Sequence, residues 1–150
     1  TIPPTPSSKL RMIPSGRSIT GDQVYSFTGN AMSLSTDGRY LAVGSLMYDS
    51  PATADAGLVR VYQRSDENNN NDNNDTWSIV GGDVQGRRGK DVGFGNDVAI
   101  SADGTTLAVA TLYPAGKVPY PTVTIFRYVP RRRLWKRVGD DVGGSHVALS

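Results

Sequence analysis

Few side chains in this sequence could carry out catalysis. The chain has no cysteine and a single histidine, His146. A Ser-His-Asp relay, a multi-histidine zinc site and a cysteine nucleophile therefore lack the residues that they need. No acid–base pair or metal cluster converges along the chain. We therefore expect no catalytic residue, no cofactor and no enzyme activity in these 150 residues.

The densest run of charge is basic. Arg131, Arg132 and Arg133 are followed closely by Lys136 and Arg137. Such a run binds a polyanion or a nuclear-import receptor, or it is the solvated tip of a hairpin. We keep the three consecutive arginines as candidate ligand-binding residues. The net charge of +2 gives no reason to expect nucleic-acid binding.

An asparagine-rich tract fills residues 65–75. A tract of this composition has too little apolar surface to join a core, and we interpret it as an expanded surface loop. Its end, Asn74-Asp75-Thr76, forms an N-glycosylation sequon. Asn74 is therefore the candidate glycosylation site.

The sequence repeats itself, and insertions fall only in the connections, as surface loops tolerate. A Ser-x-Asp-Gly turn between two apolar runs occurs twice, at Asp37 and at Asp103. A further copy begins at residues 147–150. The aligned segments are 31–43 with 97–109, 59–62 with 123–126, and 77–84 with 135–142.

Each aligned segment has the pattern of a β-strand, and Asp-Gly between apolar runs predicts a hairpin turn. Trp77 and Trp135 occupy matched positions. We expect them to pack between repeats rather than to stack on a sugar. The expected strands are 31–35, 40–45, 58–63, 76–80, 97–101, 106–111, 122–128 and 134–138.

Four strands in each repeat are typical of a β-propeller blade. The alternative is a β-sandwich of about eight strands, whose second half need not copy its first. A propeller needs about four to eight blades, so we expect an all-β propeller fragment of about two four-stranded antiparallel blades plus flanking strands. Its expected parts are a Pro/Ser-rich linker or arm (1–10), a trailing strand and connection (11–30), blade one (31–86), blade two (87–144) and the first strand of a next blade (145–150).

The second repeat resembles the FG-GAP repeat of integrin-alpha-type propellers. The resemblance lies in Phe94-Gly95-Asn96-Asp97 through Asp103-Gly104 and the Leu107-Ala108-Val109-Ala110 strand. It is most similar to the divergent form found in large secreted proteins of diatoms and other algae. The first repeat departs from the pattern, with Thr28 in the place of Phe94. WD-repeat propellers share the Ser-x-Asp-Gly turn, but their aromatic residue and aspartate close the third strand.

The resemblance implies a Ca²⁺ loop between the first two strands of each blade. Calcium prefers six to eight oxygen ligands and several carboxylates. Each turn here offers one carboxylate, from Asp37 or from Asp103. These two aspartates are the candidate metal ligands, and the alternative is that each one caps its own turn.

The resemblance also implies a role outside catalysis. We expect an extracellular or cell-surface interaction module that binds a protein or a cell-surface polysaccharide, and that contacts further blades of the same chain or other copies. Two alternatives stay open: an intracellular WD-repeat-like scaffold, and part of a propeller enzyme whose catalytic residues lie outside this segment. No stretch is long and apolar enough to predict a membrane span.

Overall fold

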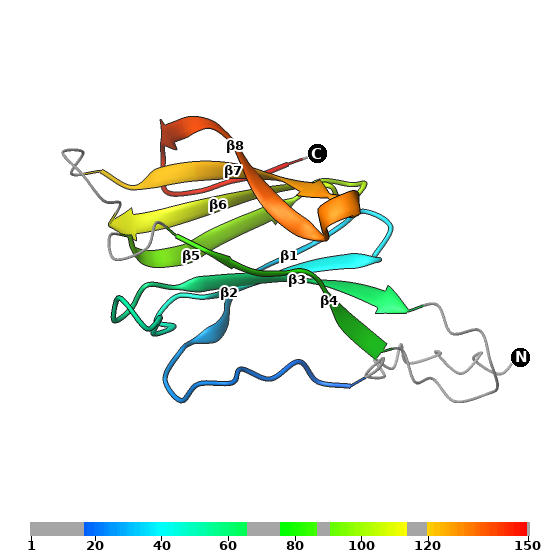
Figure 1. Ribbon diagram of the computed structural model, residues 1–150, viewed down its shortest axis with the longest axis horizontal. Helices are drawn as coiled ribbons and strands as arrows, with labels where there is room; N and C mark the ends of the chain where they lie inside the picture. Colours follow the sequence, from blue (N-terminus) through cyan, green and yellow to red (C-terminus); the bar gives the residue numbers. More distant parts are fainter. Residues whose placement is uncertain (1–16, 66–75, 87–90, 114–119, 150) are drawn as a thin grey trace, which may run out of the picture.

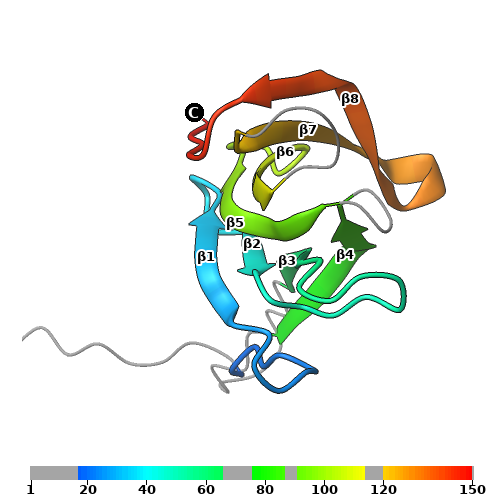
Figure 2. The same ribbon diagram turned by 90° about the vertical axis from the view of Figure 1, so that its left-hand side faces the viewer.

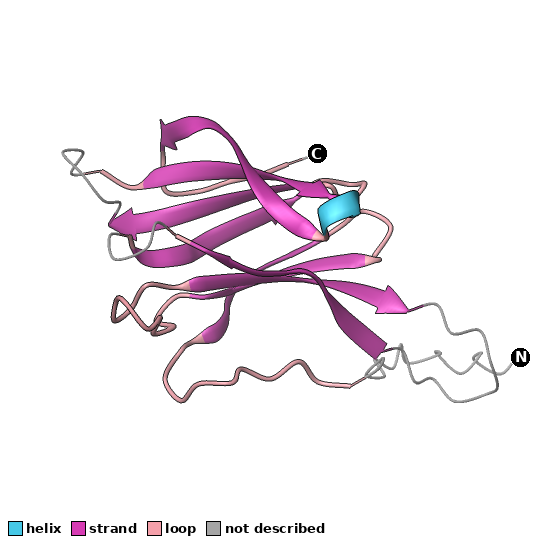
Figure 3. Cartoon of the chain, viewed as in Figure 1, coloured by secondary structure: helices cyan, strands magenta, loops and turns pink. Residues whose placement is uncertain are grey.

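The computed structural model describes residues 17–65, 76–86, 91–113 and 120–149. Within these ranges the protein is all-β, with two antiparallel four-stranded sheets in which neighbours in sequence are neighbours in space (Figures 1 and 3). A single turn of 3-10 helix, η1 (Pro130–Arg132), accompanies them. The first sheet contains β1 (Thr28–Leu34), β2 (Tyr40–Ser45), β3 (Leu58–Ser65) and β4 (Thr76–Gln85). The second contains β5 (Val92–Ile100), β6 (Thr106–Tyr113), β7 (Thr122–Val129) and β8 (Leu134–Gly143).

The two sheets repeat each other in register. Leu41 pairs with Tyr62 in the first sheet, and Leu107 pairs with Phe126 at the matched place in the second. The first strand of each sheet also carries an irregularity at the same repeat position, between Thr28 and Met32 and between Phe94 and Asp97. The all-β prediction and the order of strands within each repeat are therefore confirmed.

The fourth strand of each sheet runs further than the sequence predicts. The prediction ended these strands at residues 80 and 138, whereas β4 ends at Gln85 and β8 at Gly143. Gly81 and Gly82 both have positive φ angles, of 78° and 73°. Glycine adopts this conformation without steric cost, so the chain forms a bulge there and pairing resumes beyond it.

The sheets pack face to face around one apolar core (Figure 2). β5 lies against β1, β2 and β3 of the first sheet. Phe94 in β5 is 1% exposed, and its ring meets that of Phe126 edge to face at 5.9 Å. The remaining buried members of this core are Ala42, Val59, Val61, Val84, Val98, Ile100, Leu107 and Val109.

Short segments flank the two sheets on their outer faces. Arg17, Ser18, Ile19 and Thr20 line a groove with Trp77 and Tyr62 of the first sheet. Val147 packs on the side of the second sheet that faces away from the first. In the described ranges no helix is long and apolar enough to cross a membrane.

Candidate functional site

The Ser-x-Asp-Gly turns are closed by their own side chains. Asp37 Oδ1 accepts hydrogen bonds from the Ser35 hydroxyl at 2.7 Å and from the Arg39 amide at 3.0 Å. Ser35 Oγ in turn accepts a bond from the Tyr40 amide at 2.9 Å. These bonds satisfy the backbone of a turn that Gly38, with φ of 71°, completes.

The second turn repeats this arrangement with one additional bond. Asp103 accepts from the Ser101 hydroxyl at 2.6 Å and from the amide and the hydroxyl of Thr105 at 3.0 and 2.8 Å. The hydrogen bond from Ser101 is the main reason that the pKa of Asp103 falls to about 2. The Ser35 hydroxyl lowers the pKa of Asp37 in the same way.

These aspartates have the geometry of turn caps. Each turn supplies one carboxylate, and no group of three or more acidic or histidine side chains gathers in the part of the chain that the structure describes. Calcium sites need several carboxylates. The two candidate metal ligands of the sequence therefore serve their own hairpins in this structure.

The lowered pKa of Asp103 predicts that the free energy of unfolding decreases in acid. Its pKa is about 2 in the folded protein against an ordinary value of 3.8, so the unfolded chain binds more protons across that window. The stabilisation is complete above the ordinary value and disappears as the pH falls toward 2. We expect the melting temperature of Asp103→Asn to depend less on pH between these limits than that of the unmodified protein. Asp140→Asn, in β8 and outside any turn, is the control, and parallel pH profiles of protein and Asp103→Asn would contradict the prediction.

The three candidate arginines lie at the tip of the β7–β8 hairpin. Arg131 and Arg132 belong to η1, and Arg133 ends it in a left-handed conformation with its amide bonded to the Pro130 carbonyl at 3.2 Å. All three side chains are exposed. In the described ranges, none of them takes part in an ion pair.

Both aspartate turns and this hairpin lie at the same end of the molecule (Figure 1). We call this the turn end, formed by residues 35–39, 101–105 and 130–133. Its carboxylates at Asp37 and Asp103 are engaged by their own turns, whereas its three consecutive arginines face solvent. The turn end therefore presents a basic surface.

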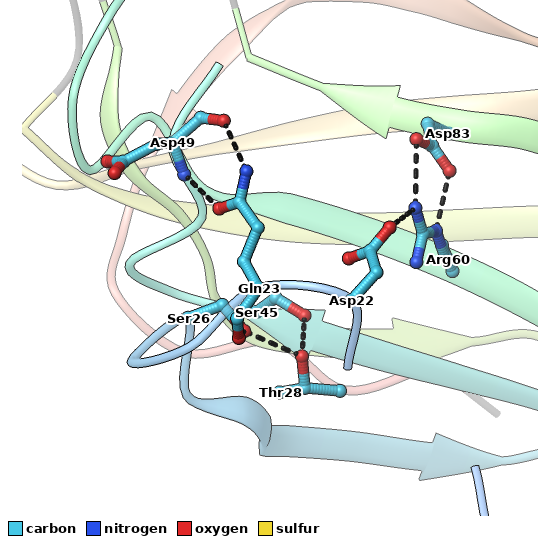
Figure 4. Close-up of polar contacts among 8 residues, drawn as sticks. All are labelled: Asp22, Gln23, Ser26, Thr28, Ser45, Asp49, Arg60 and Asp83. Atoms are coloured by element: carbon cyan, nitrogen blue, oxygen red, sulfur yellow. Dashed lines mark hydrogen bonds and ion pairs between the residues drawn. The ribbon is translucent and has the colours of Figure 1, made fainter. Parts of the chain in front are cut away.

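An ion-pair cluster on the first sheet was not foreseen from the sequence. Arg60 in β3 pairs with Asp83 in β4 at 2.6 Å and with Asp22 of the preceding segment at 2.8 Å (Figure 4). Asp83 and Asp22 raise the pKa of Arg60 above its ordinary value. The outward position of Arg60 in an alternating strand was the only available signal, and it could not identify Asp22 as a partner.

Further polar contacts fix residues 22–28 to the first sheet. The Gln23 side chain donates to the Asp49 carbonyl at 2.9 Å and accepts from the Asp49 amide at 2.8 Å. Thr28 shares hydrogen bonds with Ser26 and with Ser45, as Figure 4 shows. This segment is therefore attached to β2 and to the connection that follows it.

The two tryptophans have different surroundings. Trp135 crosses to the first sheet, where its indole Nε1 donates to the Val80 carbonyl at 2.9 Å. The predicted packing between repeats is therefore confirmed for Trp135. Trp77 lines an outer groove of about 410 Å³ with Arg60 and Tyr62, whereas the matched groove at Trp135 measures about 290 Å³ and lies between the sheets.

The single histidine contacts one carboxylate. His146 Nδ1 lies 3.3 Å from Asp97 Oδ2, and its side chain is 87% exposed. The same oxygen accepts the Val147 amide at 3.0 Å. This contact attaches the end of the chain to β5.

Asn74, most of the tract 65–75 and the whole of residues 1–10 lie outside the described residues, so the glycosylation prediction stays a prediction. Comparison with known proteins adds no assignment: no family model matches the chain, and no curated protein matches it significantly. The FG-GAP resemblance therefore stays a prediction as well.

Proposed function

We propose that this protein is a non-catalytic interaction module built from propeller-type blades of the FG-GAP kind, and that it works outside the cell or at the cell surface. Its blades are the two matched sheets. Its ligand is an anionic polymer, a sulfated or carboxylated polysaccharide, bound at the turn end through Arg131, Arg132 and Arg133.

Contacts between successive repeats support the propeller part of this proposal. Between the sheets, the side chain of Asn30 in β1 donates to the Gly95 carbonyl of β5 at 3.2 Å. One repeat further along, the side chain of Asp97 in β5 accepts the Val147 amide. β1 thus contacts β5, the first strand of the next repeat, and β5 contacts Val147, which belongs to the start of a third copy. A two-sheet sandwich needs no such third step, so radial repetition explains the contact better.

The exposed arginines carry the binding part of the proposal. Arginine forms paired hydrogen bonds with carboxylate, sulfate and phosphate groups, and three adjacent guanidinium groups suit a polymer with regularly spaced charges. Arg131 and Arg132 lie in η1, and Arg133 directly follows it in the left-handed conformation, so the three arginines stay together at one tip. Arg60, by contrast, already has two carboxylate partners and is not available for a ligand.

Chromatography on immobilised heparin, a sulfated polysaccharide, tests the binding site. We expect the protein to elute at clearly higher salt than the triple variant Arg131→Ala, Arg132→Ala and Arg133→Ala. Because binding releases counterions, the salt dependence of the binding constant is also expected to fall with each arginine that is removed.

Two controls separate a specific tip from general charge. The triple variant Arg131→Lys, Arg132→Lys and Arg133→Lys keeps the positive charge. It is therefore expected to retain most of the affinity for heparin and to lose the part that is due to paired hydrogen bonds. The variant Arg17→Ala removes a positive charge outside the turn end and is expected to elute close to the unmodified protein. Equal elution of the unmodified and triple alanine proteins would refute the proposed site.

A further inference from the structure

The outer face of the first sheet has apolar side chains at positions that are buried in the second sheet. Met32 and Leu34 in β1 are 64% and 56% exposed. Their repeat counterparts in β5, Val98 and Ile100, are each 3% exposed because they pack against the first sheet. The outer face of β1–β4 therefore has the apolar pattern of a face that is covered by another sheet.

The outer face of the second sheet shows the converse relation. Val142 in β8 is 62% exposed, whereas its counterpart Val84 in β4 is 4% exposed and belongs to the core between the sheets. Ala108 and Val123 on this face correspond to Ala42 and Val59, which are completely buried in that core. The outer face of β5–β8 thus corresponds to the inner face of β1–β4.

These two outer faces are the counterparts of the two faces that already pack together inside the molecule. We propose that a second copy of this chain docks head to tail, with the outer face of its first sheet on the outer face of the second sheet of its neighbour. The contact continues the existing interface by one further step. Because the two faces differ, the association is heterologous and leads to a ring or to an open filament.

Docking requires two flanking segments to move. On the first sheet, residues 17–20 line a groove with Tyr62 and Trp77, and Asp22 pairs with Arg60 at 2.8 Å, so this segment covers part of the outer face that has to dock. Val147 lies on the outer face of the second sheet, in the neighbourhood that β1 of the incoming copy has to occupy. Within the described ranges, residues 144–147 are held by the polar contacts of His146 and Val147 with Asp97 and by the hydrogen bond from the Gly144 amide to the Pro121 carbonyl. Deletion of residues 145–150 is therefore expected to strengthen self-association severalfold.

Two single variants test the proposal by complementation. Leu34→Arg blocks the outer face of the first sheet, and Val142→Arg blocks that of the second. Both side chains are more than half exposed in one copy, so each variant is expected to fold, which circular dichroism and the melting temperature verify. In sedimentation velocity over a concentration series, we expect the unmodified protein to associate beyond a dimer and each variant alone to bind itself at least about tenfold more weakly.

The mixture of the two variants gives the decisive result. Each retains one unblocked face, and these faces are complementary, so equal amounts are expected to form a dimer and nothing larger. An unmodified protein that stays monomeric at high concentration, or a mixture that stays monomeric, would overturn the proposal. Self-association of one variant alone at unmodified strength would indicate a like-with-like contact and would also overturn it. The proposal rests on the repeated sheets and not on ligand binding, so a monomer that still binds heparin would refute this inference alone.

Discussion

Replacing Phe94 with alanine is expected to lower the free energy of unfolding by about 3–5 kcal/mol. Among the residues that the structure describes, Phe94 is the largest fully buried side chain, and it lies between the sheets against Phe126. Removing the ring leaves a cavity at the place where β5 meets the first sheet, and a β-sheet framework cannot close such a cavity completely. Chemical denaturation, followed by the two tryptophans, measures the effect.

Leu34→Ala provides the matched control for this prediction. Leu34 has the repeat position of the buried Ile100, but it is 56% exposed in one copy. At a protein concentration too low for self-association, its truncation is expected to cost no more than about 0.5 kcal/mol. A cost below about 1 kcal/mol for Phe94→Ala would mean that the sheets do not pack through this residue.

The local pattern of the sequence was sufficient to predict that each strand exists, although β1 and β5 begin earlier and β4 and β8 end later than predicted. Residues 58–63 alternate, and their valines, Val59 and Val61, are buried as the alternation requires. The Asp-Gly turns were equally predictable, because aspartate and glycine each satisfy one local demand of a tight turn. Repetition then identified which segments belong to the framework, since insertions fall only between them.

Contacts between distant segments could not be predicted in the same way. The Arg60–Asp22 pair joins residues 38 positions apart, and no local rule connects them. The special role of Phe94 was also hidden, since its counterpart in the first repeat is Thr28. Such features depend on how one sheet meets the next, and periodicity within a strand carries no information about that.

The candidate site was predicted in part. The sequence placed Arg131, Arg132 and Arg133 on a hairpin, and the structure places them at an exposed tip. It also offered Asp37 and Asp103 as metal ligands or as turn caps, and the hydrogen bonds show turn caps. What the sequence could not provide is the common location of these groups at the turn end, because that depends on the relative position of the two sheets.

Gly57→Ala is the second substitution with a large expected effect, because it acts on the backbone contact between the sheets. Gly57 forms a parallel bridge with Phe94, and the neighbouring Ala56 carbonyl accepts the Phe94 amide at 3.1 Å. A Cβ atom on Gly57 would collide with the backbone of Phe94, and φ of 80° is itself unfavourable for alanine. Overpacking and strain together predict a loss of about 3–4 kcal/mol in the free energy of unfolding.

Gly38→Ala separates the collision from the strain. Gly38 has a similar φ of 71°, but in the described part of the chain no heavy atom beyond its two sequence neighbours lies within 4 Å of the position that its Cβ would take. The only expected cost of this variant is the conformational strain of alanine at positive φ, which lowers the free energy of unfolding by about 1 kcal/mol. The difference between the two variants measures how closely β5 approaches the connection before β3. Equal losses of the free energy of unfolding for both variants would mean that the sheets lie further apart than described. The interface between the sheets could then no longer serve as the pattern for the proposed head-to-tail contact.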